Sequence, residues 1–132
     1  MIIVFGDYMK NYSRQREAIL NALRATKSHP SASSVYEAVR KEIPNISLGT
    51  VYRNLAELAE NGDISAIPLN DGIDRFDGDT TPHIHLVCKR CSKITDLPID
   101  DDFASKLATD TGFSPDSTVY VVYGVCKDCN RK

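Results

Sequence analysis

No stretch of this 132-residue sequence approaches the roughly 18 consecutive apolar residues that a membrane-spanning helix needs. The opening run from Met1 to Phe5 is apolar, but Gly6 and Asp7 end it too early for the core of a secretory signal. Internal repeats and low-complexity tracts are also missing, and the 42% hydrophobic and 26% charged residues are ordinary for a globular protein. We therefore expect a cytoplasmic protein with one domain or two small ones.

A strong excess of positive charge is missing too, because the net charge is −2. Taken over the whole chain, this value argues against nucleic-acid binding. The charges are unevenly distributed, however: from Lys10 to Arg53, eight lysines and arginines stand against three glutamates, a local excess of five. The N-terminal part could therefore carry a nucleic-acid interface, with solvated helix faces as the alternative.

Three amphipathic patterns in the N-terminal part predict three short helices. The first covers residues 13–25 with Ser13 as a plausible N-cap, the second follows Pro30 and Ser31 and stops at residues 43–45, and the third starts at Ser47 and stops near residues 61–62. In the third, Val51, Leu55 and Leu58 form the expected buried stripe. Three helices with tight connections are typical of a helix-turn-helix.

A β-hairpin should follow these helices. Residues 64–69 and 73–77 read as its strands, and the Asp71-Gly72 pair after Asn70 should supply the positive φ angles of a tight turn. Helices followed by a hairpin predict a winged helix in residues 1–78. A hinge at 79–82 should lead to a small α/β domain in 83–132, with strands at 83–88, 93–97 and 117–125 and a helix at 101–111. The predicted fold class is α+β.

All four cysteines fall into two pairs, Cys88-x-x-Cys91 and Cys126-x-x-Cys129, and none is left over. Two such pairs can complete a tetrahedral shell of four thiolates, the closed form of a structural zinc site. Disulfides in a secreted protein and a thioredoxin-like redox pair are the alternatives, but an export signal and a βαβ context are both missing. The 34 residues between the pairs imply that the ion would join the start of this domain to its end.

Two of the three histidines, His83 and His85, are two residues apart in a predicted strand, so both imidazoles should point to one face. A pair of this kind also occurs by chance on protein surfaces. Here Asp77 precedes the pair, and Asp96 should return beside His85 on the next strand. If His29 joins them from the N-terminal half, three imidazoles and two carboxylates would suit Fe²⁺, Mn²⁺ or Zn²⁺.

These segments together resemble the ferric uptake regulator family from about Lys10 onward. The resemblance rests on SRQREAIL (13–20), HPSASSVYEAV (29–39), ISLGTVYRNLAELAENGDI (46–64), RFD (75–77), HIHLVCKRCSKITD (83–96) and GVCKDC (124–129). It implies a homodimeric, metal-dependent transcriptional repressor. Its winged helix would read an A/T-rich inverted repeat in double-stranded DNA, and its C-terminal α/β domain would dimerise.

Within the family, the mixed cluster of His29, Asp77, His83, His85 and Asp96 resembles the regulatory iron or manganese site of the peroxide-sensing branch. Classical iron sensors usually carry extra histidines and a glutamate in place of Asp96, and zinc sensors often recruit a further cysteine. The resemblance implies that peroxide reacts at bound iron and oxidises a ligand histidine, His29 or His83. Two features depart from the family: the usual extra N-terminal helix is replaced by about a dozen residues, and Arg14 stands where proline is common.

The third helix is the expected reader of the major groove. Arg53 can donate two hydrogen bonds to guanine or phosphate and Tyr52 can stack on thymine methyl groups, while Thr50 and Asn54 are further candidates. The alternative for Tyr52 is a core aromatic. We expect no enzyme; a small metal-dependent hydrolase or peroxidase and a metal-storage module are the competing functions, but five protein ligands leave little room for a substrate.

Overall fold

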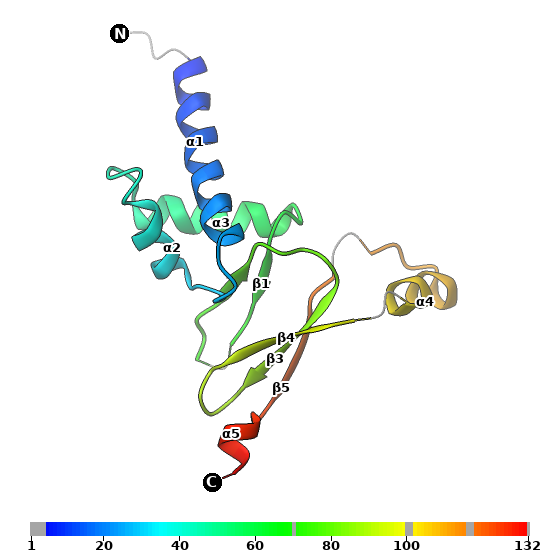
Figure 1. The fold of residues 1–132 in the computed structure, drawn as a ribbon. Helices are drawn as coiled ribbons and strands as arrows, with labels where there is room; N and C mark the ends of the chain where they lie inside the picture. Colours follow the sequence, from blue (N-terminus) through cyan, green and yellow to red (C-terminus); the bar gives the residue numbers. More distant parts are fainter. Residues whose placement is uncertain (1–4, 70, 100–101, 116–117, 132) are drawn as a thin grey trace.

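The structure is a computed structural model that describes residues 5–69, 71–99, 102–115 and 118–131. Within these ranges the helices are α1 (Phe5–Arg24), α2 (Ala32–Val39), α3 (Leu48–Glu60), α4 (Asp102–Thr111) and α5 (Lys127–Asn130). The strands are β1 (Ser65–Ile67), β2 (Arg75–Asp77), β3 (His83–Cys88), β4 (Ile94–Pro98) and β5 (Tyr120–Gly124). The helices of the first half and the sheets that follow confirm the α+β class (Figure 1).

Helix α1 is longer than the sequence pattern predicted, and its first turns extend away from the other helices (Figure 1). The proposed N-cap at Ser13 is wrong, because this residue lies inside the helix. Two polar contacts with the region of α3 hold the middle of α1: the Tyr12 hydroxyl donates to Glu57, and Arg16 pairs with Asp63 at 2.8 Å. Such long-range contacts have no signature in the local apolar spacing from which the helix was predicted.

Helices α2 and α3 begin at the predicted caps. The Ser31 hydroxyl accepts a hydrogen bond from the Ser34 N–H, and the Ser47 hydroxyl accepts one from the Thr50 N–H. Helix α2 ends at Val39 and continues only as turns, so its end is earlier than predicted. The side chains that pack the three helices against one another and against β2 are Ala18, Ile19, Leu23, Ala32, Val35, Val39, Ile43, Ile46, Val51, Leu55, Leu58, Ile64 and Phe76.

The predicted hairpin is present, with β1 and β2 antiparallel and Ala66 opposite Phe76. Both strands are shorter than expected. The predicted turn is partly wrong: Gly72 has a positive φ of 80°, but Asp71 does not, and its carboxylate instead accepts a hydrogen bond from the Ile73 N–H at 2.9 Å. Asn70 lies outside the described residues.

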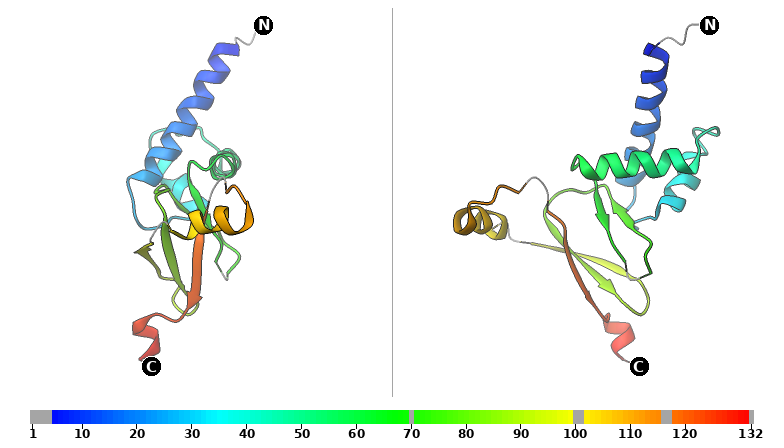
Figure 2. Two further views of the ribbon diagram at one scale, coloured as in Figure 1. Left: turned by 90° about the vertical axis from the view of Figure 1, so that its right-hand side faces the viewer. Right: turned by 180° about the vertical axis from the view of Figure 1, so that it is seen from behind.

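The second sheet has the order β4-β3-β5, with β3 antiparallel to β4 and parallel to β5. Helix α4 lies in the connection from β4 to β5, away from α1 to α3 (Figures 1 and 2). The predicted starts at residues 101 and 117 lie outside the described residues. The short helix α5 was not predicted, because four residues show no periodic pattern.

A small apolar cluster joins the hairpin side of the molecule to the second sheet. Ile67 and Leu69 pack with Val87, and the partly buried Ile94 and Val121 cover them. The Tyr123 hydroxyl also donates to the Pro68 carbonyl at 2.5 Å. These contacts place the end of the helical half directly against the second sheet. Among the described residues, the helices include none that is long and apolar enough to cross a bilayer.

Candidate metal centres

The four cysteines lie at the edge of the second sheet where β3 and β5 end. Because these strands are parallel, with Cys88 opposite Gly124, the Cys-x-x-Cys pairs that follow their carboxyl ends meet. The four sulfur atoms all lie within 4.8 Å of one another, and those of Cys91 and Cys126 are 3.7 Å apart. The long connection containing α4 therefore ends where it began, at one potential tetrahedral site.

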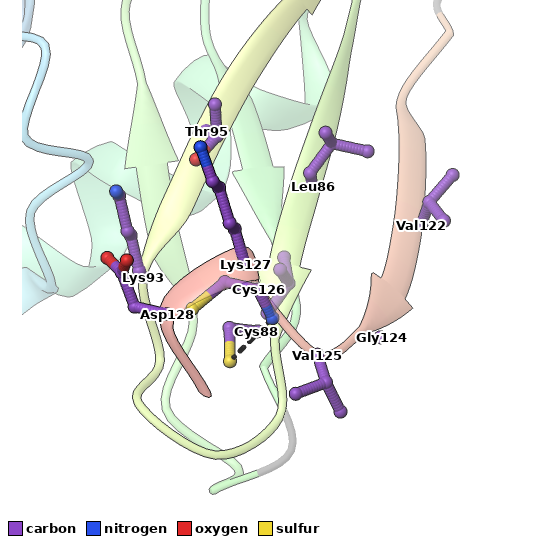
Figure 3. A pocket seen from close by; sticks show the side chains of 11 residues that line it. Leu86, Cys88, Lys93, Thr95, Val122, Gly124, Val125, Cys126, Lys127 and Asp128 are labelled. Carbon is purple, nitrogen blue, oxygen red and sulfur yellow. Dashed lines mark hydrogen bonds between the residues drawn. The ribbon is translucent and has the colours of Figure 1, made fainter. Parts of the chain in front are cut away.

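The electrostatics of this cluster favour a bound cation. Hydrogen bonds from the N–H groups of Cys91 and Cys126 lower the pKa of the Cys88 thiol to about 6. The neighbouring Cys126 instead raises the pKa of Cys129 to about 12. One sulfur is thus readily deprotonated, while four thiolates together need a positive ion between them. Cys88 and Cys126 line a pocket together with Lys127, whose amino group ends beside Thr95 (Figure 3).

The second cluster joins the two halves of the chain. His29 Nε2 lies 3.0 Å from Asp96 Oδ1 and 3.4 Å from Asp77 Oδ2, and His85 Nε2 lies 2.9 Å from the same Asp77 oxygen. Ligand atoms of these four residues all lie within 4.8 Å of one another. Two imidazoles and two carboxylates are thus close enough together to bind one ion.

Each ligand is positioned by a different element. His29 follows α1 with a left-handed backbone (φ 53°), which is unusual for a residue other than glycine and directs its ring inward. Asp77 is the last residue of β2, and the antiparallel register sets His85 opposite Asp96, as predicted. His29, His85 and Asp77 are buried, whereas the Asp96 side chain is 37% exposed.

The polar atoms of this cluster are incompletely satisfied by the protein itself. His29 Nε2 is buried and close to two carboxylates, yet it makes no hydrogen bond of good geometry. Asp77 raises the pKa of His29 above its usual value, against the effect of burial. Burial opposes the charge of Asp77, but contacts with His29 and His85 outweigh it and hold the pKa of Asp77 below its usual range. A divalent ion would accept the lone pairs that now face one another, so the donor set fits such an ion.

His83 stands at the margin of this cluster. It is outside the group of four, but its Nε2 lies 3.0 Å from Asp77 Oδ2 and 2.9 Å from His85 Nε2. Its Nδ1 lies 2.6 Å from the Thr81 carbonyl oxygen, which can only accept a hydrogen bond, so Nδ1 carries a proton and donates it to this bond. Nε2 faces Asp77 and is the nitrogen that would bind a metal when it carries no proton. All five predicted residues are thus brought together.

The candidate DNA-reading residues divide into two groups. Tyr52 is 52% exposed, so it is not the core aromatic of the alternative interpretation. Arg53 is exposed and donates to the Thr50 hydroxyl at 3.3 Å, which places both on the open side of α3. Asn54 is buried and donates to the Thr50 carbonyl at 2.9 Å. Its side chain is therefore directed away from the surface that Tyr52 and Arg53 share.

Comparisons with known proteins agree with this geometry. Residues 9–123 match the profile of the "Ferric uptake regulator family". The chain is 38% identical over 120 residues to the peroxide-responsive repressor PerR of Staphylococcus saprophyticus, covering 89% of this chain and 81% of that protein. It is equally identical over 120 residues to the peroxide operon regulator of Bacillus subtilis, with coverages of 89% and 83%.

A solved structure shows the same fold. The Campylobacter jejuni peroxide stress regulator superposes with a TM-score of 0.79 at 29% identity, covering 96% of this chain and all of that one. The match thus extends over nearly the whole chain, including the helices of the first half and the second sheet. The chain therefore belongs to the ferric uptake regulator family and is a metal-dependent transcriptional regulator of the PerR-like kind, not an enzyme.

Proposed function

We propose that this protein is a cytoplasmic repressor that senses peroxide through iron or manganese bound at His29, Asp77, His83, His85 and Asp96. The observation that carries the proposal is that nitrogen and oxygen ligands from both halves converge there, without a thiol. Such a mixed set suits Fe²⁺ or Mn²⁺. The names of the relatives from Staphylococcus saprophyticus and Bacillus subtilis support the peroxide signal.

The ion would couple DNA binding to the signal by holding the two halves in one arrangement. His29 comes from the helical half, whereas His85 and Asp96 come from the second sheet. A ligand can shift a conformational equilibrium only by its differential affinity for the two states. An ion that binds His29 and Asp96 together favours the arrangement of the structure, in which His29 Nε2 lies 3.0 Å from Asp96 Oδ1. Loss of either ligand removes that bias.

DNA recognition is assigned to the exposed side of α3, with Tyr52 and Arg53 as the main readers and Thr50 beside them. In a dimer, two such helices would enter successive major grooves of an A/T-rich inverted repeat. Asn54 is not included in this surface because it is buried. Arg53→Ala should weaken specific binding by about 1–3 kcal/mol, with Lys106→Ala on α4 as the matched control. Equal affinity of both variants for the operator would refute the assignment.

The dimer would form through the C-terminal half, which exposes an unusual amount of apolar surface. The large exposed side chains of this half are Leu97, Phe103, Phe113, Val119, Val122 and Tyr123. A cavity of about 440 Å³ lies between Val122, Leu86 and the cysteine cluster (Figure 3). Burying such a surface against a second copy removes it from water. For the cysteine cluster we propose structural zinc, because four thiolates close a tetrahedral shell.

Peroxide sensing can be tested by exchanging the metal. Bound iron(II) would supply the electrons that cleave the O–O bond of hydrogen peroxide, whereas manganese(II) in the same site is far less readily oxidised. His29 and His83 would be among the residues that hold the ion, so one of their rings should gain one oxygen atom of the peroxide while the other oxygen leaves as water. Iron-loaded protein should then release its operator after peroxide treatment, and manganese-loaded protein should keep it.

Mass spectrometry separates this outcome from its competitors. An added mass of one oxygen on a peptide with His29 or His83 supports the proposal, and Asp96→Glu should reduce that oxidation. DNA release with unmodified histidines and oxidised cysteines would refute it. Release only on removal of iron, with no effect of peroxide, would make the protein an iron-responsive repressor instead.

A further inference from the structure

A cavity of about 680 Å³ opens beside the mixed cluster, between the end of α1, the segment after β2, and β4. Asp77, His83 and Asp96 line it, so the cluster has one side that faces solvent-accessible space. The opposite side is closed, since His29 and His85 are 4% and 2% exposed.

The charges around this cavity are nearly balanced. Arg24 and Lys27 contribute two positive charges, and three carboxylates contribute three negative ones, which leaves −1 when the histidines are neutral. Within the described part of the chain, neither cation forms an ion pair with a carboxylate. A bound divalent ion would change the sum from −1 to +1. With the histidines neutral, as metal binding requires, the ion therefore makes the cavity attractive to a small anion.

We infer that this cavity binds a small oxygen-donor anion of the carboxylate, bicarbonate or phosphate class as an additional ligand of the regulatory metal. The inference rests on the proposed metal site. Asp77, His83 and Asp96 line the cavity, whereas His29 and His85 are buried, so a further ligand of an ion held by these residues would have to enter from the cavity. Lys27 and Arg24 hold the anion by charge-assisted hydrogen bonds.

The anion and the metal then bind cooperatively. If the metal raises the affinity for the anion by some factor, the anion must raise the affinity for the metal by the same factor. The metal concentration at which the repressor binds DNA consequently depends on the supply of the anion. This gives the regulator a second input that acts through Arg24 and Lys27, which belong to the helical half, without a second metal site.

The test measures manganese affinity of the full-length, zinc-containing protein by the electron paramagnetic resonance signal of free Mn²⁺. Titrations are run in chloride alone and with added acetate, bicarbonate or inorganic phosphate, each corrected for its own manganese binding in a protein-free titration. At least one of the three should tighten the manganese Kd by roughly five- to 150-fold, the usual range of coupling between sites. No tightening by any of them would overturn the inference.

Variants connect the effect to the cavity. Lys27→Gln and Arg24→Gln should retain manganese binding in chloride and lose most of the tightening by the anion. Lys41→Gln is the control, because Lys41 is an exposed cation that does not line the cavity, and this variant should keep the tightening by the anion. Tightening that persists unchanged in the Lys27→Gln, Arg24→Gln double variant would also overturn the inference. Failure of the protein to bind manganese in every buffer would instead refute the proposed metal site, so the two failures are distinguishable.

Discussion

Gly78→Ala should weaken regulatory metal binding although Gly78 is not a ligand. A Cβ atom at this position would lie 3.0 Å from the backbone N of Arg24 and 3.0 Å from the carbonyl carbon of Leu23. Both neighbours are main-chain atoms at the end of α1, so they cannot move aside as a flexible side chain would. Overpacking of this kind costs about 1–3 kcal/mol. The lower conformational entropy of alanine in the unfolded chain offsets about 0.4–1 kcal/mol of this cost.

The strain acts on the metal site because Gly78 directly follows Asp77, while His29 lies in the loop that follows α1. Separating these two segments by a few tenths of an ångström moves the two ligands apart. If about 1.4 kcal/mol of strain is relieved when the metal leaves, the manganese Kd rises about tenfold. Urea unfolding of the metal-free protein and manganese titration of the folded protein measure the two effects separately.

Gly124→Ala is the matched control, because a Cβ atom there meets nothing within 4 Å. It should leave both the free energy of unfolding and the manganese Kd nearly unchanged. A Gly78→Ala variant that equals the parent in both measurements would show that the segment after β2 can retract freely from α1. The reasoning from the close backbone contact would then be wrong.

Three further changes test other parts of the structure. Leu55→Ala removes a fully buried side chain from the helical core and should lower the free energy of unfolding by about 2–5 kcal/mol; a loss below 1 kcal/mol in urea would contradict the assigned core. Cys126→Ser should abolish the tightly bound metal and the dimer together, as measured by elemental analysis and sedimentation, and a variant that retains its metal would refute a four-sulfur site. Val122→Asp places a charge on the exposed apolar surface and should yield monomers that keep the metal of the cysteine cluster; an unchanged dimer would move the interface elsewhere.

Most of the helical half was predictable because its signals are local. Ser31 and Ser47 cap their helices as expected, and the stripe of Val51, Leu55 and Leu58 is buried. The full length of α1 was not predictable, since the middle of the helix is held by contacts such as the Arg16 pair with Asp63, which is 47 residues away. The turn at Asp71 differs from the predicted one because the Asp71 carboxylate, and not a backbone carbonyl, accepts the hydrogen bond from the Ile73 N–H.

The mixed cluster was predictable in membership but not in geometry. The period of two in β3 and the expected register placed His85 beside Asp96 correctly. Nothing in the spacing indicated the left-handed backbone of His29, or that His83 would be at the margin of the group. The cavity beside the cluster was also not foreseen, because Arg24 and Lys27 carry no motif and reach it only through the packing of α1.

The parallel pairing of β3 and β5 has a consequence for the order of events during protein synthesis. Cys88 leaves the ribosome 38 residues before Cys126, and bringing the two together in a flexible chain costs about 3 kcal/mol of loop-closure free energy. An ion bound to the first cysteine pair would thus complete its shell only when the second pair arrives, so its full binding would be coupled to folding. An ion enclosed by the four sulfurs would therefore be selected from the metals present when the chain folds, whereas an ion at the other cluster, where Asp96 is partly exposed, could exchange with the metals present later.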